Sequence, residues 1–281
     1  MSALVIARKE FVDAIRSRTL QGLVVLFATF ICGGIVVATN VPTLIDADVD
    51  PATFGILFGL LSPAALVVPV ISVLVGYRAI AGEVADGGIY CLLGLPHTRR
   101  DVLVGKFLGR FGVVTAAILV GFTVGAATLY LTVTSFAVGP YLTFVAATLL
   151  LGGVYLAFTT SISAATASPS RAAWGGFGVF VVFQFLWELA GFLARYAVTG
   201  TASPEPPLPA WYTTFVRLSP QNAYQAAATV GLPSDDPFVA GIVAGEEASL
   251  LTSRPFAFVI LIGWLSIPLA VSYWQVTTME F

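Results

Sequence analysis

Six long apolar stretches, separated by shorter polar segments, constrain the fold of this chain more than any other feature. An α-helix rises 1.5 Å per residue, so about twenty apolar residues span the roughly 30 Å hydrocarbon core of a bilayer. Stretches of this kind lie at about 20–39, 54–77, 108–133, 142–164, 173–195 and 256–276. Because backbone in lipid must satisfy its own hydrogen bonds, each is expected to be a helix. The sequence predicts an all-α integral membrane protein with six transmembrane helices in a single transmembrane domain, 1–281.

The composition supports a membrane protein and argues against a nucleic-acid-binding protein. Only 10% of the residues are charged and 58% are hydrophobic, whereas a soluble domain carries roughly a quarter charged residues. The formal net charge is −2, so no electrostatic affinity for nucleic acid is expected. Membrane lipid is the expected surrounding.

Lysine and arginine are distributed unevenly between the two sides of the predicted membrane. If the N-terminus is inside, ten of them fall in inner segments: Arg8, Lys9, Arg16, Arg18, Arg78, Arg99, Arg100, Lys106, Arg110 and Arg171. Three fall in outer segments: Arg195, Arg217 and Arg254. Basic residues concentrate on the cytoplasmic side of membrane proteins. The asymmetry predicts a multi-pass protein of the cell membrane with cytoplasmic N- and C-termini.

Residues 3–18, before the first apolar stretch, have the pattern of an amphipathic helix. Leu4, Phe11 and Ile15 recur at helical spacing, and the charged side chains fall mostly elsewhere on the helical wheel: Arg8, Lys9, Glu10, Asp13 and Arg16. A helix of this kind lies in the membrane interface, with its basic groups toward the lipid headgroups. The alternative is an ordinary extension of the first transmembrane helix.

The outer segment 197–255 precedes the last apolar stretch. It opens with a proline-rich piece, in which helix is disfavoured. Two short helices are expected after it, near 210–218 and 220–231, the second with Ser219 as its N-cap and Pro220 at its first position. The segment is too small for an independent enzyme domain.

Residues that commonly carry catalysis or bind metal are scarce. The chain has one histidine, and it lacks a Cys-x-x-Cys pair, a Gly-x-Ser-x-Gly turn and a Gly-x-x-x-x-Gly-Lys-Ser/Thr phosphate loop. We therefore expect no catalytic residues, no metal site and no cofactor in this chain.

Gln184 and Glu188 are polar residues within the fifth apolar stretch, one helical turn apart. A charge in the middle of a bilayer is costly, and such residues often mark a transport path or a subunit contact. We expect the pair to face a substrate path or a dimer interface. The alternative is that Glu188 lies near the outer headgroups, since Arg195 follows seven residues later.

The segment 79–106, between the second and third apolar stretches, mixes charged and apolar residues. A helix descending from the second stretch is expected to continue from Glu83 to Asp86 and to break at the glycines 87–88. A short helix carrying Leu92, Leu93 and Leu95 is expected to follow and to end at Pro96. Thr98 and Asp101 then form a capping box for the next helix. The short helix either contacts a partner protein or lies flat on the inner leaflet.

The same segment carries the motif of a known family. In order, the motif positions are Glu83, Gly87-Gly88, Leu92-Leu93, Pro96, Thr98-Arg99 and Gly105-Lys106, and they are preceded by the pair Lys9-Glu10 in the N-terminal helix. With six apolar stretches and a long outer loop before the last, the chain resembles the membrane subunits of the ABC type-2 exporter family. This family includes the permeases of nitrous oxide reductase maturation.

The resemblance implies a function and two protein partners. It implies a permease subunit of an ATP-binding-cassette exporter, which acts with a cytoplasmic ATPase subunit and a second permease copy as a homodimer or pseudo-dimer. ATP and Mg²⁺ would bind the ATPase. Segment 79–106 would be the coupling segment that docks on the ATPase, and its contact residues would be Glu83, Asp86, Gly87, Leu92, Leu93, Leu95, Pro96, Arg99 and Arg100.

Two alternatives belong to other classes of function. One is a membrane scaffold that is driven by an ATPase but does not transport. The other is an intramembrane hydrolase or transferase using Glu188 with an outer-loop acid such as Asp235.

Overall fold

The computed structural model describes eight ranges of the chain: 2–44, 57–87, 98–132, 137–166, 168–201, 208–235, 237–242 and 249–278. Every regular element within these ranges is helical. Six stretches are long and apolar enough to cross a membrane: Leu20–Asn40, Gly59–Ala85, Arg100–Thr132, Val138–Thr166, Pro169–Thr199 and Phe256–Gln275. The all-α membrane fold expected from the sequence is confirmed.

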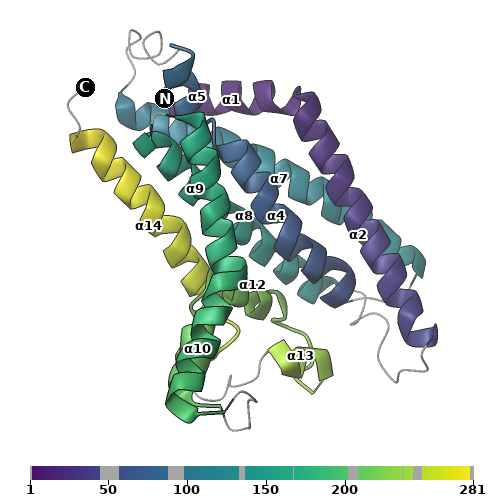
Figure 1. Cartoon of the computed structure of the whole chain (residues 1–281). Helices are drawn as coiled ribbons and strands as arrows, with labels where there is room; N and C mark the ends of the chain where they lie inside the picture. Colours follow the sequence, from purple (N-terminus) through teal and green to yellow (C-terminus); the bar gives the residue numbers. More distant parts are fainter. Residues whose placement is uncertain are drawn as a thin grey trace.

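The first two helices, α1 (Ser2–Ile15) and α2 (Arg18–Leu44), are separate elements. The helix stops at Arg16 and Ser17 and resumes in a new direction. Figure 1 shows α1 lying across one end of the bundle, while α2 runs along it. Residues 3–18 and the first transmembrane helix therefore do not form one continuous helix.

The second stretch consists of a π-helical turn, η1 (Leu57–Leu61), followed by α4 (Ser62–Gly76) and the short α5 (Ala81–Ala85). A turn over 77–80 separates α4 from α5. The helix expected from Glu83 toward Asp86 is present as α5, although the turn over 77–80 interrupts its run from α4. The expected break after Asp86 is confirmed, since Gly87 takes a left-handed φ of 74°.

The centre of the bundle is α8 (Val138–Thr166), which packs against α4, α7 (Arg99–Thr132), α9 (Pro169–Val181) and α14 (Phe256–Thr278). In the most apolar part of α8, two thirds of the residues are buried within the chain. Aromatic rings and aliphatic side chains from these neighbours surround it. The functional features described below lie around this core.

A single long stretch is formed by α9, the π-helical turn η2 (Val182–Leu186) and α10 (Trp187–Thr199). Figure 1 shows α10 extending past the lower end of the bundle. In the most apolar part of the α9–η2–α10 stretch, only 17% of the residues are buried within the chain. Most of this surface is therefore left to lipid or to another protein.

The segment before α14 packs against the opposite end of the bundle from α1 (Figure 1). It contains α11 (Ala210–Arg217), α12 (Pro220–Ala228), α13 (Pro237–Ile242) and η4 (Leu250–Thr252). The two helices expected here are confirmed. The Ser219 hydroxyl accepts a hydrogen bond from the Asn222 amide, so the expected N-cap of α12 is confirmed as well.

Helix α12 is buried between α8 and α14 and reaches α4. Gln221 donates a hydrogen bond from Nε2 to the Ala65 carbonyl over 3.1 Å. That carbonyl lacks its usual helical partner, because the residue four positions on is Pro69, which has no N–H. A side chain of α12 therefore completes the hydrogen bonding of the transmembrane helix α4.

Candidate functional site

Lys106, near the start of α7, is the centre of a buried group of charges. Its side chain has no exposed surface. The ammonium Nζ donates to Glu10 Oε1 in α1 over 2.8 Å and also to Glu83 Oε1 in α5. One lysine therefore joins three elements that lie far apart in the sequence.

Arg110 follows one turn later on α7 and extends this group. Its guanidinium pairs with Glu10 Oε2 over 3.1 Å and donates to the Val75 carbonyl at the end of α4. That carbonyl is open because the Ala79 amide, its helical partner, bonds Gly76 instead. We call Glu10, Glu83, Lys106 and Arg110 the charge cluster.

The charge cluster is balanced, with two carboxylates and two cations. Burying a charge is costly unless it is paired, and removal of one partner from a buried pair typically costs about 3–5 kcal/mol. Two buried atoms of the cluster, Glu83 Oε2 and Arg110 Nε, have no hydrogen-bond partner. The ion pairs thus hold α1, α5 and α7 together, while one oxygen of Glu83 and one nitrogen of Arg110 make no hydrogen bond.

Two glycines of α7 let α1 approach closely enough to form the cluster. A Cβ atom at Gly105 would lie 2.6 Å from the Ala3 carbonyl oxygen, and one at Gly109 would lie 2.6 Å from both the Ala7 carbonyl oxygen and Glu10 Cβ. Small residues at such crossings allow two helix backbones to meet. Gly105, quoted above as part of a family motif, therefore has a packing role beside Lys106.

The opposite face of α1 is exposed and mixes apolar with basic side chains. Leu4 and Val5 are 70% and 65% exposed, and Val12 and Ile15 also lie open. Arg8, Lys9 and Arg16 are exposed as well, whereas Phe11 is half-buried. Phe11 lies over Gly112 of α7, where an added Cβ would meet its ring at 3.1 Å.

Helix α5 is held on a second side by Ser163, near the end of α8. The Ser163 hydroxyl accepts from the amides of Ile80 and Ala81 at 3.1 and 2.9 Å and donates to the Tyr77 carbonyl at 2.9 Å. These three bonds fix the turn between α4 and α5. The start of segment 79–106 is therefore attached to α8 by Ser163 and to α7 by Glu83.

The exposed end of α5 carries Asp86, which pairs with Arg78 over 3.1 Å. The two side chains are 69% and 51% exposed, so water screens this pair and it adds little stability. Gly87 ends the described part of the segment. Leu92, Leu93, Leu95 and Pro96 lie outside the described residues.

The far end of the segment re-enters the described structure at Thr98. The Thr98 hydroxyl accepts from the Asp101 amide at 3.2 Å, and Asp101 Oδ2 accepts from the Thr98 amide at 3.1 Å. The expected capping box is therefore confirmed. Arg99 begins α7, and the guanidinium carbon of Arg100 lies 4.9 Å from the ring centroid of Tyr273 in α14.

Gln184 and Glu188 lie in different surroundings. Gln184 belongs to the π-helical turn η2 and is half-buried, with its Oε1 unpartnered, whereas Glu188 in α10 is exposed. The neighbouring Trp187 stacks on Phe215 of α11, with ring centroids 4.9 Å apart, and donates to its carbonyl. Glu188 is thus level with the segment that precedes α14.

The charge cluster is suited to mechanical and electrostatic linkage. Its carboxylates, those of Glu10 and Glu83, are paired with the side chains of Lys106 and Arg110. Within the described ranges, no group of three or more His, Cys, Asp or Glu residues could hold a metal ion. The arrangement ties α5, which opens the charged segment, to the crossing of α1 and α7.

Sequence reasoning identified part of this site and missed the rest. Glu10, Glu83 and Lys106 were found as separate motif positions, but their mutual contact was not foreseen. Arg110 was counted only as a basic residue of one side, and Ser163 was not singled out. A lysine followed four residues later by an arginine in an otherwise apolar helix was the signal that buried acidic partners exist.

Comparisons with known proteins agree with this architecture. The model of a family described as ABC-2 family transporter protein matches residues 4–281. A probable ABC transporter permease protein NosY from Pseudomonas aeruginosa is 30% identical, over 95% of each chain. A protein of the same description from Stutzerimonas stutzeri is 28% identical, also over 95% of each chain. The chain therefore belongs to the ABC-2 transporter family, as a multi-pass membrane permease subunit.

Proposed function

We propose that the chain couples ATP hydrolysis by a separate cytoplasmic ATPase to the export of a substrate across the cell membrane. In this proposal ATP and Mg²⁺ bind the ATPase, and this chain supplies the membrane path and the docking surface. Family membership supports the transport role. The end of the bundle that carries α1 and α5 is the cytoplasmic side, since ten of the thirteen basic residues belong to segments at that end.

The observation that carries the proposal is the contact of Lys106 with both Glu10 and Glu83. Helix α5 leads directly into the segment proposed to dock on the ATPase. A displacement of that segment reaches α7 and α1 through charged contacts, and α8 through Ser163. Because Lys106 is fully buried, breaking its ion pairs is costly, which favours joint movement of the elements that they connect.

The docking surface in this proposal has an apolar centre and a polar rim. Leu92, Leu93 and Leu95, followed by Pro96, are the anchors, in keeping with the few buried residues that dominate most protein interfaces. The rim consists of charged residues on both sides of the anchors: Glu83, Asp86, Arg99 and Arg100. Gly87, with its left-handed φ of 74°, forms the turn that ends α5 just before these residues.

A second copy of the chain completes the transporter in this proposal. The α9–η2–α10 stretch offers it an apolar face on which Trp174, Phe185 and Val198 are 72%, 56% and 71% exposed. Gln184 and Glu188 lie on this stretch. We propose that they line either the interface between the copies or the substrate path beside it.

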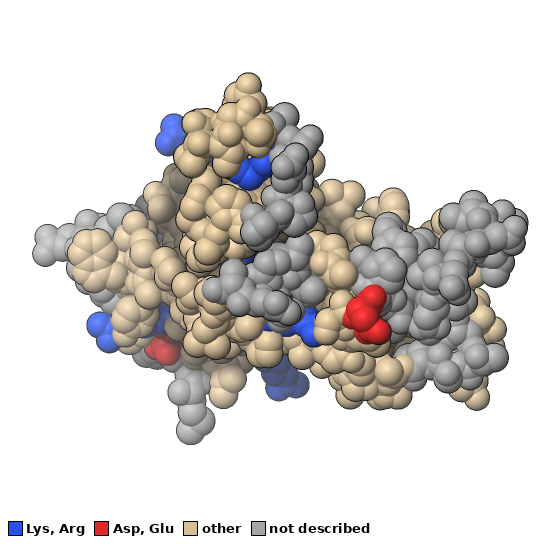
Figure 2. All heavy atoms as spheres, turned by 90° about the horizontal axis from the view of Figure 1, so that it is seen from below, with Lys and Arg blue, Asp and Glu red and all other residues tan. Residues whose placement is uncertain are grey.

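Figure 2 shows the end of the molecule opposite α1, on which the described residues expose few charged side chains. In the topology proposed here this end is the outer face, which does not contact the ATPase. It also supplies a control for docking, because Leu250 and Leu251 form an exposed leucine pair at that end.

The test is co-purification of the full chain with its ATPase from membranes. The double variant Leu92→Asp/Leu93→Asp is expected to reduce the retained ATPase by about tenfold or more, as loss of interface anchors does. The matched variant Leu250→Asp/Leu251→Asp is expected to retain it fully. Wild-type retention in the first variant would show that the docking surface lies elsewhere.

A further inference from the structure

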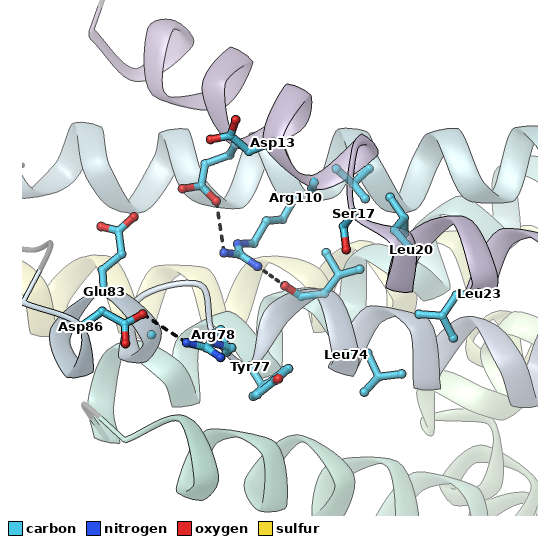
Figure 3. A pocket seen from close by; sticks show the side chains of 15 residues that line it. Asp13, Ser17, Leu20, Leu23, Leu74, Tyr77, Arg78, Glu83, Asp86 and Arg110 are labelled. Atoms are coloured by element: carbon cyan, nitrogen blue, oxygen red, sulfur yellow. Dashed lines mark hydrogen bonds and ion pairs between the residues drawn. The ribbon is translucent and has the colours of Figure 1, made fainter.

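A cavity of about 540 Å³ opens between α1, α2, α4, α5 and α7, next to the charge cluster. Figure 3 shows its two unlike ends. Glu83, Asp86 and Arg78 lie at one end, and Leu20, Leu23 and Leu74 lie at the other. The cavity is therefore amphipathic, and its apolar end runs along the two transmembrane helices α2 and α4.

The polar end carries an excess of negative charge. Four carboxylates line the cavity, from Glu10, Asp13, Glu83 and Asp86, against the two guanidiniums of Arg78 and Arg110. Lys106 does not line the cavity but pairs with Glu10 and Glu83, and its single positive charge neutralises one of these negative charges. In the described structure the Asp13 carboxylate has no ion-pair or hydrogen-bond partner, whereas Arg78 and Arg110 are both paired with acids.

The order of groups along the cavity matches that of a lipid in one leaflet. The charged end is level with α1 and α5, outside the apolar helices, and the leucines lie deeper along α2 and α4 (Figure 3). A ligand with a cationic head and an acyl chain satisfies both ends. A primary ammonium suits this site better than a trimethylammonium, because it donates three hydrogen bonds and carboxylates are acceptors.

We propose that this cavity binds one phospholipid with a primary-amine headgroup, of the phosphatidylethanolamine class. The ammonium lies against Asp13 and the neighbouring carboxylates. The phosphate lies toward Arg78, whose side chain is half-exposed. One acyl chain runs past Leu20, Leu23 and Leu74. The site requires only that the chain is embedded in a membrane, so it stands apart from the proposed coupling to an ATPase.

The experiment is native mass spectrometry of the purified full chain in detergent. The chain is supplied with equal amounts of dioleoyl phosphatidylethanolamine, phosphatidylcholine and phosphatidylglycerol. We expect one phosphatidylethanolamine per chain to be retained about two- to fivefold more than either other lipid, the range set by one partly exposed ionic contact. Equal or stronger retention of phosphatidylglycerol would overturn the proposal, because it would mean that the arginines select an anion.

Two pairs of variants separate the head and tail contacts. Asp13→Asn is expected to abolish the preference for phosphatidylethanolamine, whereas Asp235→Asn, the same change at another exposed acid, leaves it intact. Leu74→Trp is expected to lower retention of the lipid. Leu66→Trp is its control, because Leu66 lies on the same helix, is similarly exposed and does not line the cavity.

The lipid measurements are interpreted only for variants that fold like the wild type. All four positions are exposed, so the thermal unfolding of each variant is expected to match that of the wild type. An unchanged lipid preference in both Asp13→Asn and Leu74→Trp would show that the cavity is not the binding site.

Discussion

The Lys106 ammonium in α7 lies 2.8 Å from a carboxylate oxygen of Glu10 in α1, and the lysine side chain is completely buried. The two residues are 96 positions apart in the chain. The same ammonium also binds Glu83 in α5. A single cation therefore joins α1 and α5 to the third transmembrane stretch.

Removal of this cation is predicted to be strongly destabilising. Lys106→Met leaves Glu83 without its partner and Glu10 with Arg110 alone, so we expect a loss of about 3–5 kcal/mol in the free energy of unfolding. Thermal unfolding in detergent measures it, with the exposed Lys9→Met as the matched control. Adding Glu83→Gln to Lys106→Met restores the charge balance and is expected to recover most of the loss. A Lys106→Met protein as stable as the control would show that the pairing contributes nothing.

The crossing of α1 and α7 depends on the absence of side chains at Gly105 and Gly109. Alanine normally stabilises a helix relative to glycine by about 0.5–1 kcal/mol. At Gly109 the added Cβ would lie 2.6 Å from the backbone of α1, so we expect Gly109→Ala to lower the unfolding temperature and to expose α1 to protease. Gly263→Ala has open space around it and is expected to be neutral or stabilising. Equal behaviour of the two variants would rule out the close approach.

Gln221 and Pro69 are predicted to be energetically coupled through the Ala65 carbonyl. In the wild type, Gln221→Leu leaves this buried carbonyl without a donor, at a cost of about 1–3 kcal/mol. In a Pro69→Ala background the new amide at position 69 supplies the missing helical bond. The cost of Gln221→Leu is then expected to fall toward zero. A double-mutant cycle on unfolding free energies measures the difference, and additive effects would contradict it.

Ser163 is predicted to hold the turn between α4 and α5. Ser163→Ala removes the acceptor for the amides of Ile80 and Ala81, so hydrogen exchange at these two amides is expected to accelerate by about tenfold or more. Ser266→Ala is the control, because the Ser266 hydroxyl bonds only the Ile262 carbonyl of its own helix. Unchanged exchange in Ser163→Ala would mean that the turn is held by other contacts.

The six membrane-crossing stretches were predictable from the sequence, because lipid permits few alternatives for long apolar stretches. Local hydrogen-bonding patterns were predictable as well: the Thr98–Asp101 box and the Ser219 cap each depend on residues three apart. The turn over 77–80 was not foreseen, since its own sequence does not reveal the three hydrogen bonds that Ser163 of α8 makes there.

The candidate site was only partly predictable for a related reason. Glu10, Glu83 and Lys106 stand out individually, but their contact depends on how closely α1 crosses α7, which Gly105 and Gly109 determine in three dimensions. Arg110 gains its role from a carbonyl left open at the end of α4. No periodicity in one segment encodes a carbonyl that becomes available in another.

The most direct test of the proposed coupling is the response of the complex to ATP when the link through Lys106 is absent. Spin labels at exposed position 194 in α10 of two copies report their distance in the complex with the ATPase. In the wild type we expect ATP to shift this distance. In Lys106→Met/Glu83→Gln, which keeps the cluster balanced, we expect the shift to disappear in complexes that retain the ATPase. An ATP-induced shift of wild-type size in this variant would contradict the coupling role of the charge cluster.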